Sequence, residues 1–219
     1  MQMPTNEATQ IEDMTEKDLI NLRRTIYLVI MSSVDFEEAT HKLLKLNIRE
    51  GQQLEMCTML LECCMQERTY DRLYGLTAQR LCQVAEVYKH KLNEVFQTHF
   101  ETVHRHEVNK IRNAAKFFSH LLHTESIGWS CIQHIQLTEE DTTSASRIFI
   151  KLLFQDISQN LGVQKFVKKL EEDEVKIYTA GIFPKDSVVN ARFAINFFTM
   201  IGLGAVTVEL REFIADAPR

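Results

Sequence analysis

The chain has 219 residues, enough for one large domain or two closely packed halves, and a net charge of -5 from 25 Lys and Arg against 30 Asp and Glu. Only 7 Gly and 3 Pro are present, too few for the tight turns that an all-β or α/β fold needs between its strands. The charge argues against a protein that coats nucleic acid by bulk electrostatics, so any contact with a polyanion must be local.

The sequence also indicates in which cellular compartment the chain is found. No segment approaches the roughly 18 consecutive apolar residues of a membrane span, and residues 1–10 lack the basic start and apolar core of a signal peptide. The number of cysteines is odd, 5, and none form a Cys-x-x-Cys pair, which favours neither a zinc ribbon nor a disulfide framework. These features predict an intracellular chain in a reducing compartment, without membrane contact.

Apolar residues recur at intervals of three and four, which predicts helices along almost the whole chain. Thr15 with Asp18 resembles a capping box at the start of the first helix, and Asp35 with Glu38 repeats that signal for the second. Residues 1–14 are polar and are expected to be a flexible segment before a single helical domain over residues 15–219. The apolar stripes of this part lie in residues 19–30, 39–44, 54–64, 70–81, 86–103 and 108–122.

The stripe in residues 108–122 is widened by a second apolar row, so this helix is expected to be central. Residues 126–135 are expected to form a short helix. Thr138 with Asp141 predicts the start of a long helix that ends at Gly162.

Towards the C-terminus, the acidic run 171–174 is expected to divide two short helices, the second of which ends at Pro184. Asp186 is the expected cap of the next helix, which Gly202 and Gly204 end. A final helix is expected over residues 206–214.

One internal repeat is visible. RNAAKFFS from Arg112 and RFAINFFT from Arg192 match at Arg, Ala, Phe, Phe and Ser or Thr, 80 residues apart. Stacked pairs of antiparallel helices produce such repeats, although coincidence stays an alternative.

Few residues suggest catalysis. Gly202 and Gly204 follow a predicted helix, so they indicate a helix stop and not a nucleotide-binding loop. His120 and His123 share a helical face, but no carboxylate or Cys at matching spacing supports a metal site there. His99 lies on an apolar stripe and is expected to be a hydrogen-bonded core residue. We therefore expect no catalytic, cofactor or metal site.

The polar side of the central helix is the strongest candidate for binding. It carries Asn109, Arg112, Asn113, Lys116, His120 and His123, and the repeat places Arg192, Asn196 and Thr199 on the equivalent side of a later helix. This side is either a solvated surface or a partner-binding face, and in the second case the residues expected to carry it are Arg112, Lys116, Arg192 and Asn196. A third interpretation makes Arg112 and Arg192 buried anchors between helix pairs.

Several long segments look familiar together: LRRTIYL from Leu22, DFEEATHKLLK from Asp35, CCMQERTYDRLYGLTAQRLC from Cys63, HRHEVNKIRNAAKFFSHLL from His104, SRIFIKLLFQ from Ser146 and NARFAINFFTMIGLG from Asn190. They resemble the MA-3 domain of the nucampholin family of pre-mRNA splicing factors over about residues 15–214. The resemblance implies an all-α fold of stacked antiparallel helix pairs, a HEAT-like array of the MA-3 type.

The resemblance also implies a function. It indicates a noncatalytic, nuclear interaction domain of the spliceosome that docks on the large splicing scaffold near the 5′ exon and supports splicing and exon-junction-complex deposition. Family members carry an upstream MIF-four-G domain that holds a DEAD-box helicase. That domain is absent from these residues, so the chain resembles a C-terminal fragment and helicase binding is not assigned to it. The chain alone is expected to be a monomer, and a local contact with the 5′ exon inside the complex stays open.

Two rival functions remain. The first is an MA-3 module that binds a DEAD-box RNA helicase directly, and the second is an all-helical hydrolase with a site built on His120 and His123.

Overall fold

A computed structural model describes the backbone of residues 7–218 and the side chains of residues 15–218. Within this part of the chain the regular elements are all helices, which confirms the all-α prediction. They are α1 (Glu7–Ser32), α2 (Phe36–Lys45), α3 (Gln53–Gln66), α4 (Arg72–Val84), α5 (Glu86–Thr102), η1 (Val103–Arg105), α6 (Val108–His123), η2 (Trp129–His134), α7 (Ser144–Leu161), α8 (Val163–Glu171), α9 (Asp173–Lys176), α10 (Val188–Met200), η3 (Gly204–Thr207) and α11 (Val208–Asp216).

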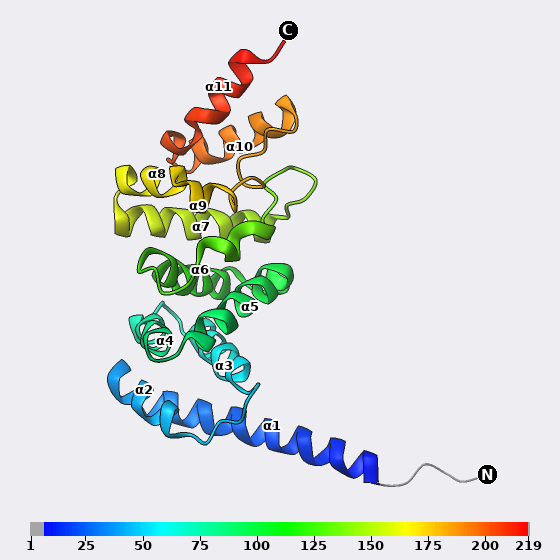
Figure 1. The fold of residues 1–219 in the computed structure, drawn as a ribbon, viewed down its shortest axis with the longest axis vertical. Helices are drawn as coiled ribbons and strands as arrows, with labels where there is room; N and C mark the ends of the chain where they lie inside the picture. The colour runs from blue at the N-terminus through cyan, green and yellow to red at the C-terminus, as the bar shows by residue number, and fades with distance from the viewer. Residues whose placement is uncertain (1–6, 219) are drawn as a thin grey trace, which may run out of the picture.

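The helices stack in chain order along the longest axis of the molecule (Figure 1). α1 and α2 form one end, followed by α3 with α4, α5 with α6, and α7 with α8 and α9, while α10 and α11 form the other end. Each layer buries apolar side chains against the next, so one hydrophobic core runs through the stack. This arrangement is the predicted HEAT-like array.

Helix α6 lies in the middle of the array, as predicted. Its apolar face is buried from Ile111 onwards, although Val108 at its start is exposed, and Phe118 shows no exposure to solvent. The ring of Phe118 meets Phe96 of α5 edge to face at 4.9 Å between centroids, and it lies 6.5 Å from Phe149 of α7. Edge-to-face contacts of this kind favour one fixed packing of the three helices.

The predicted start of the second helix is confirmed, and that of the first helix is wrong. Asp35 caps α2 as predicted, because its carboxylate accepts a hydrogen bond from the backbone N–H of Glu38 at 2.8 Å. The start predicted at Thr15 is wrong: α1 begins at Glu7, and the Glu, Gln and Ala residues before Thr15 are good helix formers. Residues 1–6 of the predicted flexible segment lie outside the described residues.

The start of α7 was predicted too early. Thr138 and Asp141 do form the reciprocal contact, with the Thr138 hydroxyl accepting from the Asp141 N–H at 3.1 Å, but they close a turn. A second pair, Thr143 and Ser146, forms the capping box from which the helix starts. The end of the helix at Gly162 is as predicted, and this residue adopts a φ of 84°.

The C-terminal helices show similar shifts. α8 and α9 meet inside the acidic run as predicted, but α9 ends at Lys176 and not at Pro184. The intervening loop packs on the end of η2, where a Cβ on Gly181 would collide with the carbonyl oxygen of Ile135.

The cap of α10 is Ser187, which accepts from the Asn190 N–H at 3.1 Å, and not Asp186, which accepts from the Asn190 side chain. Gly202 follows the end of α10 with a φ of 83°, whereas Gly204 starts η3. The final helix, α11, begins at Val208, slightly later than predicted.

Candidate partner-binding face

The four residues proposed from the sequence lie on two helices. Arg112 and Lys116 lie on α6, and Arg192 and Asn196 lie on α10. Lys116 is half-buried and the other three are exposed. None of the four side chains makes a hydrogen bond or ion pair with another residue of the described chain. Arg112 and Arg192 are therefore not buried anchors, and their guanidinium groups are free to meet a partner.

Asn113 does not belong to this face, contrary to the prediction. Its side chain is 1% exposed, and Nδ2 donates to the backbone carbonyls of Cys64 at 3.1 Å and Glu67 at 2.8 Å. These carbonyls lie at the end of α3, where the Cys64 carbonyl also accepts the backbone N–H of Glu67 at 3.3 Å. Asn113 lies at the edge of the polar arc nearest α3, so it closes the α3 terminus instead of facing solvent.

His120 and His123 lie side by side, with ring centroids 5.3 Å apart. Nε2 of His120 is 2.7 Å from Oε1 of Gln79 on α4. Burial, with smaller effects from His123 and Arg72, lowers the pKa of His120 to about 4, so this ring is neutral at pH 7. A Cβ on Gly75 would lie 3.0 Å from Cγ of His120. His120 therefore joins α4 to α6.

Metal binding has no further support in the geometry. Among the residues that the structure describes, no group of three or more His, Cys, Asp or Glu side chains could hold a metal ion. His99 is buried as predicted, but its Nε2 lacks the expected hydrogen bond within the described chain.

α10, like α6, contacts α7. In Figure 1, α7 lies between the two repeated helices. Phe118 of α6 packs on one part of α7, and Phe198 of α10 meets Phe154 of α7 at 5.6 Å. The Arg147 guanidinium of α7 also lies 5.0 Å from the ring centroid of Phe193. Both helices thus contact α7, but α6 packs on it extensively, whereas α10 packs mainly against η3 and α11.

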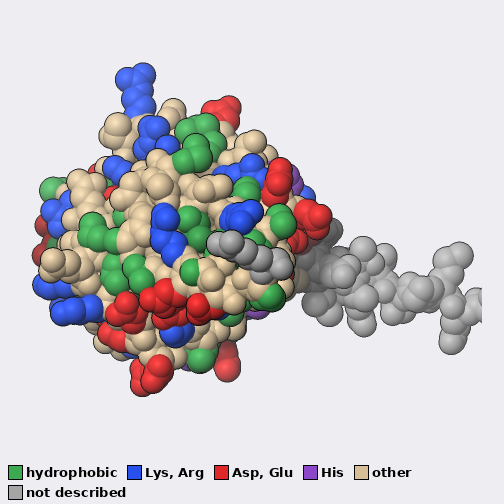
Figure 2. Space-filling model, turned by 90° about the horizontal axis from the view of Figure 1, so that it is seen from above, with side chains coloured by type: hydrophobic (Ala, Val, Ile, Leu, Met, Phe, Trp, Pro, Cys, Tyr) green, Lys and Arg blue, Asp and Glu red, His purple; other side chains and the backbone are tan. Residues whose placement is uncertain are grey.

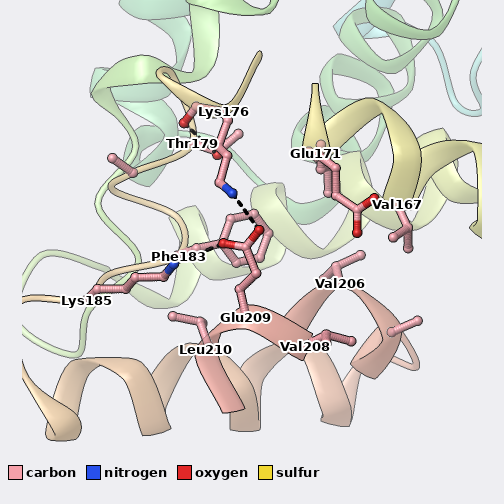
Figure 3. Close-up of a pocket in the computed structure, with 13 residues that line it drawn as sticks. Val167, Glu171, Lys176, Thr179, Phe183, Lys185, Val206, Val208, Glu209 and Leu210 are labelled. Carbon is pink, nitrogen blue, oxygen red and sulfur yellow. Dashed lines mark hydrogen bonds and ion pairs between the residues drawn. The ribbon is translucent and has the colours of Figure 1, made fainter. Parts of the chain in front are cut away.

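A groove near the C-terminus was missed at the sequence level (Figure 3). It has a volume of about 240 Å³, and Figure 3 shows Val167, Phe183, Val206, Val208 and Leu210 among its apolar lining. Lys176 and Lys185 reach Glu209 from two directions, at 2.5 and 2.9 Å, and these hydrogen bonds lower the pKa of the Glu209 carboxyl. Because the lining comes from three separate stretches of the chain, residues 167–171, 176–185 and 205–210, no short sequence pattern indicates it.

Charged groups are mixed on the end of the array that carries α11. Figure 2 shows Lys and Arg scattered there among Asp and Glu, without one continuous basic patch. Such a surface offers little to the phosphates of free nucleic acid. Among the helices of residues 7–218, none combines the length and the hydropathy that a membrane span needs.

The fold and its sequence pattern define an MA3-type helical array. Residues 22–128 match the model of the MA3 domain family. The match runs from the middle of α1 to the residue before η2.

Similarity to known proteins extends beyond this domain. The chain is 50% identical over 213 residues to the pre-mRNA-splicing factor CWC22 homolog of Drosophila melanogaster, and 48% identical over 214 residues to the pre-mRNA-splicing factor cwf22 of Schizosaccharomyces pombe. It is 47% identical over 213 residues to the human CWC22 homolog.

These alignments take in 97%, 98% and 97% of this chain but only 16%, 24% and 24% of the three relatives, so the chain spans about a quarter or less of their length. The resemblance to the MA-3 region of this kind of splicing factor is confirmed.

Proposed function

We propose that this chain is a noncatalytic interaction domain that acts in pre-mRNA splicing in the nucleus. Its role is to dock on a large scaffold protein of the spliceosome near the 5′ exon, and so to support splicing and exon-junction-complex deposition. The observation that carries the proposal is the identity of 47–50% to splicing factors over nearly the whole chain.

The exposed side chains of α6 and α10 support a docking role. Arg112 and Arg192 each present a planar fork of donors, which suits carboxylates or phosphates on a partner. No contact within the described chain occupies these donors, so a partner need not break an internal ion pair to reach them. We propose Arg112, Lys116, Arg192 and Asn196 as the residues of this docking face.

A double charge reversal, Arg112→Glu with Lys116→Glu, tests this face. We expect docking to the scaffold to weaken strongly, while the melting temperature stays within a few degrees, because Arg112 is exposed, Lys116 is only half-buried, and charges at such positions contribute roughly 1 kcal/mol or less to folding. Pull-down from nuclear extract, with the recovered scaffold identified by mass spectrometry, measures docking, and a thermal melt of the same variant measures stability.

A matched variant provides the control. Lys165 and Lys168 are both exposed on α8, so Lys165→Glu with Lys168→Glu changes the net charge by the same amount on another helix. This variant should dock normally. Normal docking by a stably folded Arg112→Glu, Lys116→Glu protein would exclude the α6 face.

The same experiment separates the rival binding function. Recovery of a DEAD-box helicase without splicing scaffold proteins would favour direct helicase binding and contradict the proposal.

A further inference from the structure

A hollow on another part of the array shares no lining residue with the α6 and α10 face. It lies between the start of η2 and the α8–α9 segment and has a volume of about 420 Å³. Its lining includes Glu125, Trp129, Lys169, Glu172, Glu174 and Tyr178. We call it the acidic hollow.

The charge of this hollow is unbalanced. Three carboxylates and one ammonium line it, which leaves a net charge of -2. Lys169 is shared between Glu125 and Glu172 at 2.9 Å each, so one ammonium serves two carboxylates. Glu174 is exposed and has no ion pair within the described chain. A cationic occupant would be attracted and a nucleic acid would be repelled.

The lining contains aromatic and apolar groups as well. Trp129 is 5% exposed, and its indole Nε1 has no hydrogen-bond partner among the described residues. Buried N–H donors are nearly always paired, so the unpaired indole N–H is an unsatisfied donor in the wall of the hollow. The half-buried ring of Tyr178 lies in the same hollow, and Ile177 at its lining is 69% exposed.

Glu125, one of the carboxylates that line the acidic hollow, has an unusual backbone conformation. Glu125 has a φ of 57°, and it is the one residue other than glycine with a positive φ in the described chain. Its ion pair with Lys169 joins the loop after α6 to α8 across the hollow. The position of the Glu125 carboxylate is therefore fixed by the fold before any partner binds.

We propose that the acidic hollow binds an arginine-bearing segment of a partner protein. A guanidinium fits this lining best, because it pairs with carboxylates through a planar fork and also stacks on aromatic rings. The partner is thus a basic polypeptide and not RNA. This site is independent of the proposed docking face, and either one can fail while the other stands.

The single tryptophan of the chain makes a direct test available, since Trp129 lies in the hollow. The probe is a short peptide in which Arg alternates with Ala, titrated into the full chain. We expect a saturable change in Trp129 emission that weakens as salt is raised. A peptide with Glu in place of Arg, and a single-stranded RNA, should produce no such change.

Two variants of the same acidic run give the matched comparison. Glu174→Gln removes the unpaired carboxylate of the hollow and should weaken peptide binding roughly two- to fivefold, as expected for one exposed charge pair. Glu171→Gln removes the same charge three residues earlier, outside the hollow, and should have a smaller effect. Circular dichroism checks that both variants fold.

Three results would overturn the proposal. These are an unchanged Trp129 emission at saturating peptide, equal binding of the acidic peptide or RNA, and equal losses for Glu174→Gln and Glu171→Gln, which would indicate unspecific attraction.

Discussion

The repeated helices α6 and α10 share a sequence pattern but not an environment. Phe118 and Phe198, at matching positions, are both fully buried. One residue earlier, Phe117 has no exposure to solvent whereas Phe197 is only half-buried. α10 lies near the end of the array, with Met200 86% exposed, and α6 lies in the middle. The place of a helix in the stack therefore decides how much of its apolar face is used.

The substitution with the largest expected effect on stability lies at the centre of the array. Phe118→Ala removes a ring in contact with α5 and α7 and is expected to cost about 3–5 kcal/mol in the free energy of unfolding. Phe197→Ala on α10 should cost clearly less, because its ring is already partly in water. Urea denaturation measures both, and a Phe118→Ala loss below about 1 kcal/mol would contradict a central role for α6.

The next effect concerns a position where the repeat itself differs. Asn113 on α6 corresponds to Phe193 on α10, and Asn113 alone closes the end of another helix. Asn113→Ala should cost about 1–3 kcal/mol, because two hydrogen bonds to the end of α3 are lost and the Glu67 carbonyl loses its side-chain donor. Asn109→Ala, at an exposed position one turn earlier, is the control and should change stability by less than about 0.5 kcal/mol. Equal losses in denaturation would show that the Asn113 hydrogen bonds are unimportant.

Lowering the pH should destabilise the packing around α6 more than the packing around α10. His99 and His120 lie around α6, whereas α10 has Met200 at the position that corresponds to His120. Burial, followed by the nearby His106, lowers the pKa of His99 from 6.5 to about 3. The unfolded chain then takes up a proton at a higher pH than the folded protein, so stability falls as the pH drops from about 6.5 towards 3. This group contributes up to about 1.4 kcal/mol for each pH unit.

His99→Leu should remove this contribution and flatten the loss of stability between about pH 6.5 and 5, where most carboxyl groups stay ionised. The measurement is the unfolding free energy of both proteins across this range. Parallel slopes for the two would mean that His99 is protonated in the folded state.

Helices were predictable here because their signal is periodic and local. The ends of helices were predicted correctly where one capping residue acts alone, as at Asp35 and Gly162. The prediction was wrong where two capping signals lie close together, as at Thr138 and Thr143. The role of Asn113 could not be predicted, because the carbonyls that it binds lie 46 and 49 residues earlier in the chain. Periodicity places a residue on one side of a helix but does not say which neighbouring helix covers that side.

The smallest effect on stability should come from Arg192, and it tests whether α6 and α10 share one docking face. Arg192→Glu is expected to change the unfolding free energy by less than about 0.5 kcal/mol, because the side chain is exposed and unpaired within the described chain. If the partner contacts both helices, this variant should also weaken docking to the scaffold. The side chains of Arg112 and Arg192 lie on helices separated by α7, so the losses from Arg112→Glu and Arg192→Glu should add within about 0.5 kcal/mol in the binding free energy. Binding titrations with the purified scaffold measure the two single variants and the double variant. Docking that is weakened by Arg112→Glu but untouched by Arg192→Glu would confine the face to α6, and the repeat would then reflect packing on α7 alone.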